Sequence, residues 1–115
     1  MSLHVRLSPE THHMFNRDMF AKMKPTAFFV NTARAGLVDE EALVEALVNH
    51  KIGGAVLDVF QQEPLPADHP FRSLDNVTLA AHFAGTSTGT MTGSVKIVAN
   101  ALAKYFTTGE IHNLA

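Results

Sequence analysis

Two nearly continuous apolar runs, separated by an amphipathic helix pattern, constrain the fold of this chain more than any other feature. The runs cover residues 27–33 and 55–60, and each has the length of a strand that is buried on both faces. Between them, Asp39 is placed to cap a helix whose apolar stripe includes Leu43 and Leu47. A strand, a helix and a strand within about thirty residues predict a βαβ unit with a right-handed crossover.

The flanking segments extend this unit into a larger α/β layer. Asn16 can cap a short helix before the first run, Gly53 and Gly54 are expected to end the second helix, and residues 77–81 read as a third strand. A long helix should open within residues 85–93, and its predicted buried face comprises Met91, Val95, Val98, Ala99, Leu102 and Phe106. The expected fold class is α/β: a partial Rossmann-like domain, half of a doubly wound parallel sheet with about three strands and flanking helices.

Composition excludes several classes of function. The chain has 115 residues, enough for one small domain. Its net charge of -2 provides no basic field for nucleic acid or for an anionic membrane surface, and no apolar run is long enough to cross a bilayer. The absence of cysteine excludes disulfides and thiolate metal sites and fits a cytoplasmic protein. The seven histidines follow no ligand spacing such as H-E-x-x-H, so no metal is expected.

Three ionisable residues follow three successive strands of the predicted sheet. Arg34 follows the first strand, Glu63 lies in the Pro-rich loop after the second, and His82 closes the third. Because ligands of open α/β sheets bind at the carboxyl ends of the strands, these side chains are expected to converge. An arginine fork matches a carboxylate, a histidine exchanges protons near neutral pH, and an adjacent glutamate fixes the tautomer of that histidine. Such a site would bind a small acid and move a proton at the adjacent carbon.

Each of these residues also has an ordinary structural interpretation. Taken alone, Arg34 and Glu63 would be solvated loop residues, and His82 would be a structural residue at a strand end. Only their shared position favours a site. Asp58, a carboxylate within an apolar strand, leaves two interpretations open: a capping or turn-forming side chain, or an acceptor for a ligand amide or hydroxyl.

Four motifs, in order and with matching gaps, resemble the D-isomer-specific 2-hydroxyacid dehydrogenases, of which 3-phosphoglycerate dehydrogenase is an example. Residues 31–39 resemble N-x-x-R-G-x-x-V-D, and residues 57–65 are similar to L-D-V-F-x-x-E-P-L. Residues 81–85 resemble P-H-x-x-G, and residues 3–11 resemble L-H-x-P-L-T-P-E-T. Within the last of these, Arg6 stands where the pattern has proline and adds charge near the expected cofactor face.

The resemblance implies roles for individual residues. It implies that Arg34 holds the substrate carboxylate and keto oxygen, that His82 is the general acid–base, and that Glu63 pairs with His82. It implies that Asp58 contacts the nicotinamide carboxamide. The full set of implied cofactor-binding residues is His4, Thr11, Thr32, Ala33, Arg34, Asp58, His82 and Gly85. The implied reaction interconverts small 2-hydroxy and 2-keto acids by hydride transfer with NAD or NADP, and the acid itself is left open.

The same resemblance indicates what this sequence lacks. It contains no G-x-G-x-x-G, no acidic residue to hold the adenosine ribose and no separate substrate-binding domain. Residues 1–107 are therefore expected to be the C-terminal half of the NAD-binding domain, with 108–115 a tail towards the absent domain. We expect a fragment with little or no activity of its own; the alternative is a non-catalytic oligomerisation or interaction module. The strand at 27–33 is expected to be an unpaired edge, which favours a homodimer or higher homo-oligomer.

Overall fold

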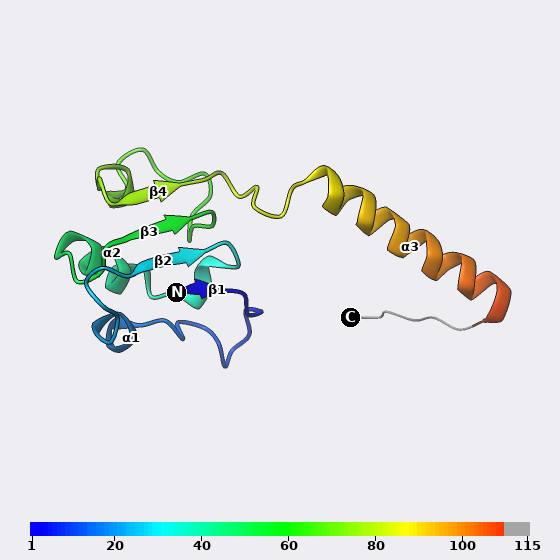
Figure 1. The fold of residues 1–115 in the computed structure, drawn as a ribbon, viewed down its shortest axis with the longest axis horizontal. Helices are drawn as coiled ribbons and strands as arrows, with labels where there is room; N and C mark the ends of the chain where they lie inside the picture. The colour runs from blue at the N-terminus through cyan, green and yellow to red at the C-terminus, as the bar shows by residue number, and fades with distance from the viewer. Residues whose placement is uncertain (110–115) are drawn as a thin grey trace. The chain divides into compact units, whose positions relative to one another are not determined.

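The computed structural model describes residues 1–109, which form two compact units, residues 1–84 and a second unit that begins at Gly85. The first unit contains a parallel sheet with helices and two 3₁₀ turns (Figure 1). Its elements in chain order are β1 (Ser2–Leu3), α1 (Arg17–Ala21), β2 (Phe28–Asn31), η1 (Ala35–Leu37), α2 (Glu40–Val48), β3 (Gly54–Leu57), η2 (Pro70–Arg72) and β4 (Val77–Leu79). The second unit contains α3 (Thr88–Thr108).

The sheet has four strands in the order β1-β2-β3-β4, and every pair is parallel. β2, β3 and β4 lie side by side and point the same way in Figure 1. The predicted half of a doubly wound sheet is confirmed, with one strand more than the three expected. The extra strand is β1, which pairs Ser2 with Val30 and Leu3 with Asn31. β2 therefore lies inside the sheet, and the prediction that residues 27–33 form an unpaired edge is wrong because β1 occupies that side.

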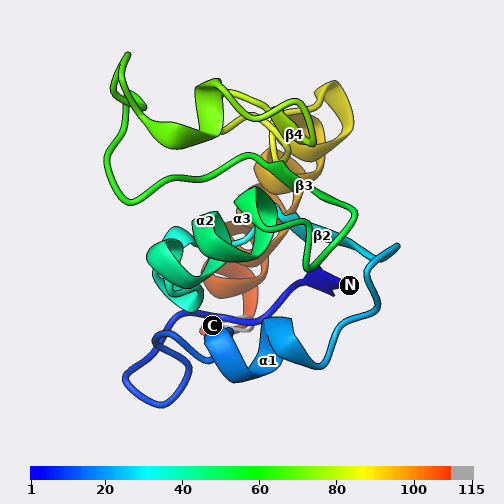
Figure 2. The same cartoon turned by 90° about the vertical axis from the view of Figure 1, so that its left-hand side faces the viewer.

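The core of the first unit lies between the sheet and its two helices. Phe29 on β2 is fully buried and packs against Phe15 and Phe20, with ring centroids 4.8 Å and 5.3 Å away. α2 lies beside β2 and β3 (Figures 1 and 2) and buries Leu43 and Leu47, as the predicted stripe requires. Burial of these apolar side chains is the main force that holds the helices on the sheet.

The caps of the short helices follow the sequence, but the end of α2 does not. Asn16 accepts hydrogen bonds from two backbone amides of α1, and Asp39 accepts one from Ala42 at the start of α2. α2 ends at Val48, and the left-handed position after it is taken by His50, with φ 49°. The predicted stop at Gly53 and Gly54 is therefore wrong; Gly54 opens β3, where a Cβ would lie 2.6 Å from the carbonyl oxygen of Asn76.

α3 has clear caps and an exposed apolar stripe. Ser87 caps its start by accepting from the amide of Thr90, and Gly109, at φ 75°, ends it in the left-handed conformation. The prediction that one face of this helix is buried is wrong, since no residue of α3 is buried; the exposed side chains include Met91, Val95, Val98, Leu102 and Phe106. The sequence pattern predicts an apolar stripe on this helix, but it does not predict whether another part of the protein packs against that stripe. Residues 110–115, most of the predicted tail, lie outside the described residues.

No helix within residues 1–109 is long and apolar enough to cross a membrane.

Candidate functional site

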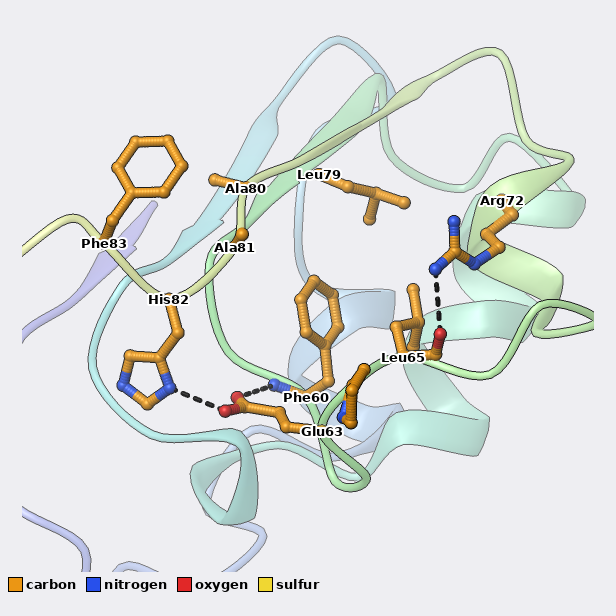
Figure 3. Close-up of a pocket in the computed structure, with 10 residues that line it drawn as sticks. Phe60, Glu63, Leu65, Arg72, Leu79, Ala80, Ala81, His82 and Phe83 are labelled. Carbon is orange, nitrogen blue, oxygen red and sulfur yellow. Dashed lines mark hydrogen bonds and ion pairs between the residues drawn. The ribbon is translucent and has the colours of Figure 1, made fainter.

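His82 and Glu63 form a hydrogen-bonded pair at the carboxyl ends of β3 and β4. His82 Nδ1 lies 2.8 Å from Glu63 Oε2 (Figure 3). The other carboxylate oxygen of Glu63 accepts a hydrogen bond from the backbone amide of Phe60, at 3.0 Å. This second bond anchors the glutamate to the end of its own strand segment and fixes the direction from which it meets the imidazole. The predicted convergence of these two residues is present in the structure.

Arg34 follows β2 and contributes charge to the same edge of the sheet. One of its terminal nitrogens, Nη1, donates to the carbonyl oxygen of Ala33 at 2.6 Å, which leaves its remaining donors available to a ligand. The guanidinium makes no hydrogen bond to Glu63, but its positive charge is one of the influences that lower the pKa of Glu63. Arg34 does not line the pocket beside His82 and Glu63; it lines a separate one with residues 4–7 and Ala33.

Asn31 sets the turn that carries Arg34, and the sequence reasoning assigned it no role. Its side chain is 2% exposed, and its Nδ2 donates to the carbonyl oxygen of Arg34 at 3.0 Å. Its Oδ1 accepts from the amide of Ala33 at 3.1 Å. A buried asparagine at the end of an apolar run is the signal that could have identified this positioning residue, because a buried amide needs partners.

Asp58 fixes the backbone that follows His82. Its carboxylate is 2% exposed and accepts from two consecutive amides, Phe83 N at 3.0 Å and Ala84 N at 2.8 Å. His82 itself has φ 56°, in the left-handed region that few non-glycine residues adopt. The structure therefore shows Asp58 in the turn-capping role, the first of its two interpretations. Its predicted contact with nicotinamide stays a prediction.

The pair lies at one edge of an open pocket of about 650 Å³. Figure 3 shows the ring of Phe60 turned towards Leu79 and Ala81, while Glu63 and His82 meet below them. The loop that carries Glu63 is braced by Arg72, which the sequence reasoning missed. Arg72 donates to the carbonyl oxygens of Leu65 and Pro66, each at 2.8 Å. The pocket thus combines an apolar wall with a pair of ionisable side chains, as sites for small organic ligands commonly do.

The remaining predicted cofactor residues are spread more widely. His4 follows β1, and its Nε2 lies 2.8 Å from Ser2 Oγ. The Thr11 hydroxyl bonds within its own turn, donating to the carbonyl oxygen of Arg6 at 2.8 Å. Thr32 and Ala33 are half-buried after β2. Gly85 begins the second unit, so its place relative to the others is not described.

Metal ligation has no candidate cluster in the described part of the chain. Within residues 1–109, no three His, Cys, Asp or Glu side chains gather in a group that could hold a metal ion.

Hydrogen bonding sets the charge state of Glu63. The bond from His82 is the largest influence and lowers the pKa of Glu63 below the ordinary glutamate value, and the bond from the Phe60 amide lowers it further. Because the folded-state pKa is depressed, the pairing contributes stability above the ordinary pKa and loses that contribution as pH falls through the folded-state value. At neutral pH, Glu63 is therefore a carboxylate that accepts from His82.

This assignment predicts the titration of one carboxyl group. In His82→Asn, we expect the pKa of Glu63 to rise towards the ordinary glutamate value, because its strongest partner is lost. Carbon-detected NMR titration of the side-chain carboxyl measures the change. Glu10, whose pKa is lowered mainly by Ser8, serves as an internal control that should not move. An unchanged Glu63 titration would contradict the pairing.

Comparison with known proteins identifies the family to which the first unit belongs. The family described as D-isomer specific 2-hydroxyacid dehydrogenase, NAD binding domain, matches residues 1–84, the whole of the first unit. The chain belongs to the D-isomer specific 2-hydroxyacid dehydrogenase family. The NAD-binding domain of this family takes NAD or NADP, and a solved member from Xanthobacter autotrophicus Py2, in complex with NADPH and MES, superposes with a TM-score of 0.85 at 31% identity. That match covers 97% of this chain and 46% of the Xanthobacter chain.

Curated dehydrogenases of the same family are more similar in sequence. Glyoxylate reductase from Thermofilum pendens is 53% identical over 87 residues, which cover 76% of this chain and 26% of the relative. D-3-phosphoglycerate dehydrogenase from Methanocaldococcus jannaschii is 44% identical over 104 residues, covering 90% of this chain and 20% of the relative. The chain thus spans about a quarter or less of the length of these two 2-hydroxyacid dehydrogenases.

Proposed function

We propose that this chain supplies the acid–base residues and the nicotinamide-facing part of an NAD(P)-dependent D-2-hydroxyacid dehydrogenase, which interconverts 2-hydroxy and 2-keto acids. The observation that carries the proposal is the bond between His82 Nδ1 and Glu63 Oε2, 2.8 Å long, at the carboxyl ends of parallel strands. Ligands of open α/β sheets bind at these ends. Arg34 follows β2, so the proposed carboxylate-binding cation lies at the same carboxyl edge of the sheet as His82 and Glu63.

His82 is proposed as the general acid and base. With Nδ1 held by Glu63, the imidazole presents Nε2 to the outside, and no group within residues 1–109 bonds that atom. Nε2 would donate a proton to the substrate carbonyl oxygen during reduction and accept the hydroxyl proton during oxidation. Glu63 would stabilise the protonated imidazolium in both directions by its negative charge.

Arg34 is proposed to hold the substrate carboxylate. A guanidinium carries five N–H donors, and only one contact, to the carbonyl oxygen of Ala33, is made within the described chain. Two parallel bonds to a carboxylate would orient the adjacent keto carbon. Such positioning supplies a large part of an enzyme's rate.

The cofactor residues proposed from the family resemblance are His4, Thr11, Thr32, Ala33, Arg34, Asp58, His82 and Gly85. Their fit to a nicotinamide is supported by the exposed His82 side chain and the apolar pocket beside it. When bound, NAD(P)H supplies the hydride, and the protein supplies orientation and proton exchange. We propose that the chain works within a homodimer or larger homo-oligomer; the exposed apolar stripe of α3 supports this. A cytoplasmic location stays a prediction.

A chimera tests the proposed function. The 87-residue segment that matches the Thermofilum glyoxylate reductase would replace its counterpart in that protein, which then supplies the remaining length. We expect the chimera to oxidise NADH or NADPH with glyoxylate, and the 115-residue chain alone to show little or no turnover, because an incomplete cradle cannot orient the cofactor.

Two outcomes would contradict this view. A chimera that folds and binds NADH without turnover would favour the alternative, a non-catalytic interaction module. Turnover by the 115-residue chain alone would show that the expected incompleteness is wrong.

A further inference from the structure

The loop that carries Glu63 is joined to α2 through the side chain of His69. This residue lies just before η2, and 15% of its side chain is exposed. Its Nδ1 accepts a hydrogen bond from the backbone amide of Phe71 at 3.3 Å. Its Nε2 lies 3.2 Å from Oε1 of Glu40, the first residue of α2. His69 therefore connects two elements that are 29 residues apart in the sequence.

These two contacts specify one tautomer of the His69 ring. The amide of Phe71 can only donate, so Nδ1 carries no proton, and the proton of the neutral ring is on Nε2. There the carboxylate of Glu40 can accept it. His82 is held in the opposite sense, because its Nδ1 faces the carboxylate of Glu63. Both contacts of His69 are therefore satisfied by the same protonation state, as a built structural link requires.

A cross-linked segment extends this link to the acid–base pair. The carbonyl oxygen of Pro66 accepts from the amide of His69 at 3.2 Å and from Nε of Arg72 at 2.8 Å. Nη2 of Arg72 donates to the carbonyl oxygen of Leu65, also at 2.8 Å (Figure 3). The segment is thereby held together as one piece, and it begins just beyond Glu63. A displacement of His69 would therefore move the backbone from which Glu63 projects.

We propose that Glu40 and His69 are positioning residues for the acid–base pair: they tie the loop that carries Glu63 to α2. The inference rests on the proposed function. At the start of the same loop, Nε2 of Gln61 donates to the carbonyl oxygen of Val38 at 3.4 Å, which is a longer and weaker bond. The bond to Glu40 is shorter and has a carboxylate acceptor, which makes it the stronger tie to the helix.

Carbon-detected NMR titration of the Glu63 carboxyl in the 115-residue chain tests the link. In Glu40→Ala we expect the pKa of Glu63 to rise towards its ordinary value, because a loosened loop weakens the bond from His82 that lowers this pKa most. Electrostatics alone would act in the opposite direction, since removal of a negative charge favours ionisation of the remaining carboxyl groups. Glu41→Ala changes an exposed neighbour in the same first turn of α2, so it is the matched control and should leave Glu63 unchanged.

Three further variants separate the link from a general loss of stability. Glu40→Gln keeps an acceptor for Nε2 of His69 and should retain most of the parent titration. His69→Asn keeps a cap for the amide of Phe71 but is shorter than histidine and loses the bond to Glu40, so it should reproduce Glu40→Ala. In Arg72→Gln, the addition of Glu40→Ala should raise the pKa of Glu63 little further, because both substitutions break the same chain of contacts. Circular dichroism confirms that each variant is folded.

Turnover separates this inference from the proposed function. In the chimera, Glu40→Ala should lower kcat by up to about tenfold, which corresponds to the loss of about one hydrogen bond, with the KM for the cofactor little changed. If the Glu63 titration moves as expected but the parent chimera shows no turnover, the link stands and the proposed function fails. An unmoved Glu63 titration in folded Glu40→Ala or His69→Asn overturns the inference, as does an equal shift in Glu41→Ala. Additive effects of Arg72→Gln and Glu40→Ala, or ¹⁵N shifts that place the proton of neutral His69 on Nδ1, also overturn it.

Discussion

His82→Asn in the chimera should lower turnover by a factor of about 10²–10⁴, the usual contribution of a positioned general acid–base. Asparagine cannot exchange a proton at the position of the imidazole nitrogen, so the carbonyl oxygen would have to take its proton from water. Asparagine is also among the few residues that tolerate φ near 56°, so the backbone turn should survive. The loss should fall mainly on kcat, since His82 is proposed to act on the reacting oxygen and not to hold the carboxylate.

His50→Asn is a closely matched control for this substitution. His50 is exposed and has φ 49°, so the chemical change and the backbone conformation are nearly the same, at a position far from the pair with Glu63. We expect unchanged steady-state kinetics for it. If His82→Asn retained full kcat while His50→Asn behaved like the parent, His82 would not be the acid–base residue.

Asp58→Asn should have the second large effect, because it weakens the support beneath His82. Asparagine has the shape of aspartate, but it places an NH₂ group against one of the two amides that the carboxylate now accepts from. One buried donor then loses its partner, which costs about 1–3 kcal/mol of the free energy of unfolding. Urea denaturation of the 115-residue chain measures this loss.

The functional part of the prediction distinguishes positioning from bulk stability. With the turn after His82 loosened, the pair with Glu63 weakens, so the pKa of Glu63 should rise towards its ordinary value and turnover of the chimera should fall. Asp75→Asn, an exposed aspartate beside β4, is the control and should change neither quantity. A variant that loses stability but keeps both the Glu63 titration and the turnover would show that Asp58 acts on the fold alone.

Local sequence patterns were sufficient to predict the βαβ unit. Residues 27–33 and 55–60 are apolar over the length of a strand, and Asp39 caps the helix between them through a contact only three residues away. The pairing of β1 with β2 was not predicted, because two paired residues carry no periodic pattern. The end of α2 was predicted too late for a different reason. Glycine usually takes the left-handed position after a helix, and here His50 takes it.

The candidate site was also predicted only in part. Topology predicted that Arg34, Glu63 and His82 share an edge, since strand ends of a parallel sheet must meet. Topology does not predict partners, because the bond between Glu63 and His82 spans 19 residues and depends on the path of the loop. Arg72 was missed for that reason: its role is to hold carbonyl groups of a loop that has no sequence period.

The left-handed backbone at His82 also limits how this site can evolve. A β-branched or bulky residue at φ 56° would destabilise the fold by about 1–3 kcal/mol through backbone strain alone, whatever its chemical role. Neutral drift at this position is therefore confined to glycine, asparagine, aspartate and histidine, and only one of these exchanges protons near neutral pH. In a relative that has lost the reaction, we therefore expect position 82 to hold one of these few residues, whereas the strands around it should vary as other core strands do.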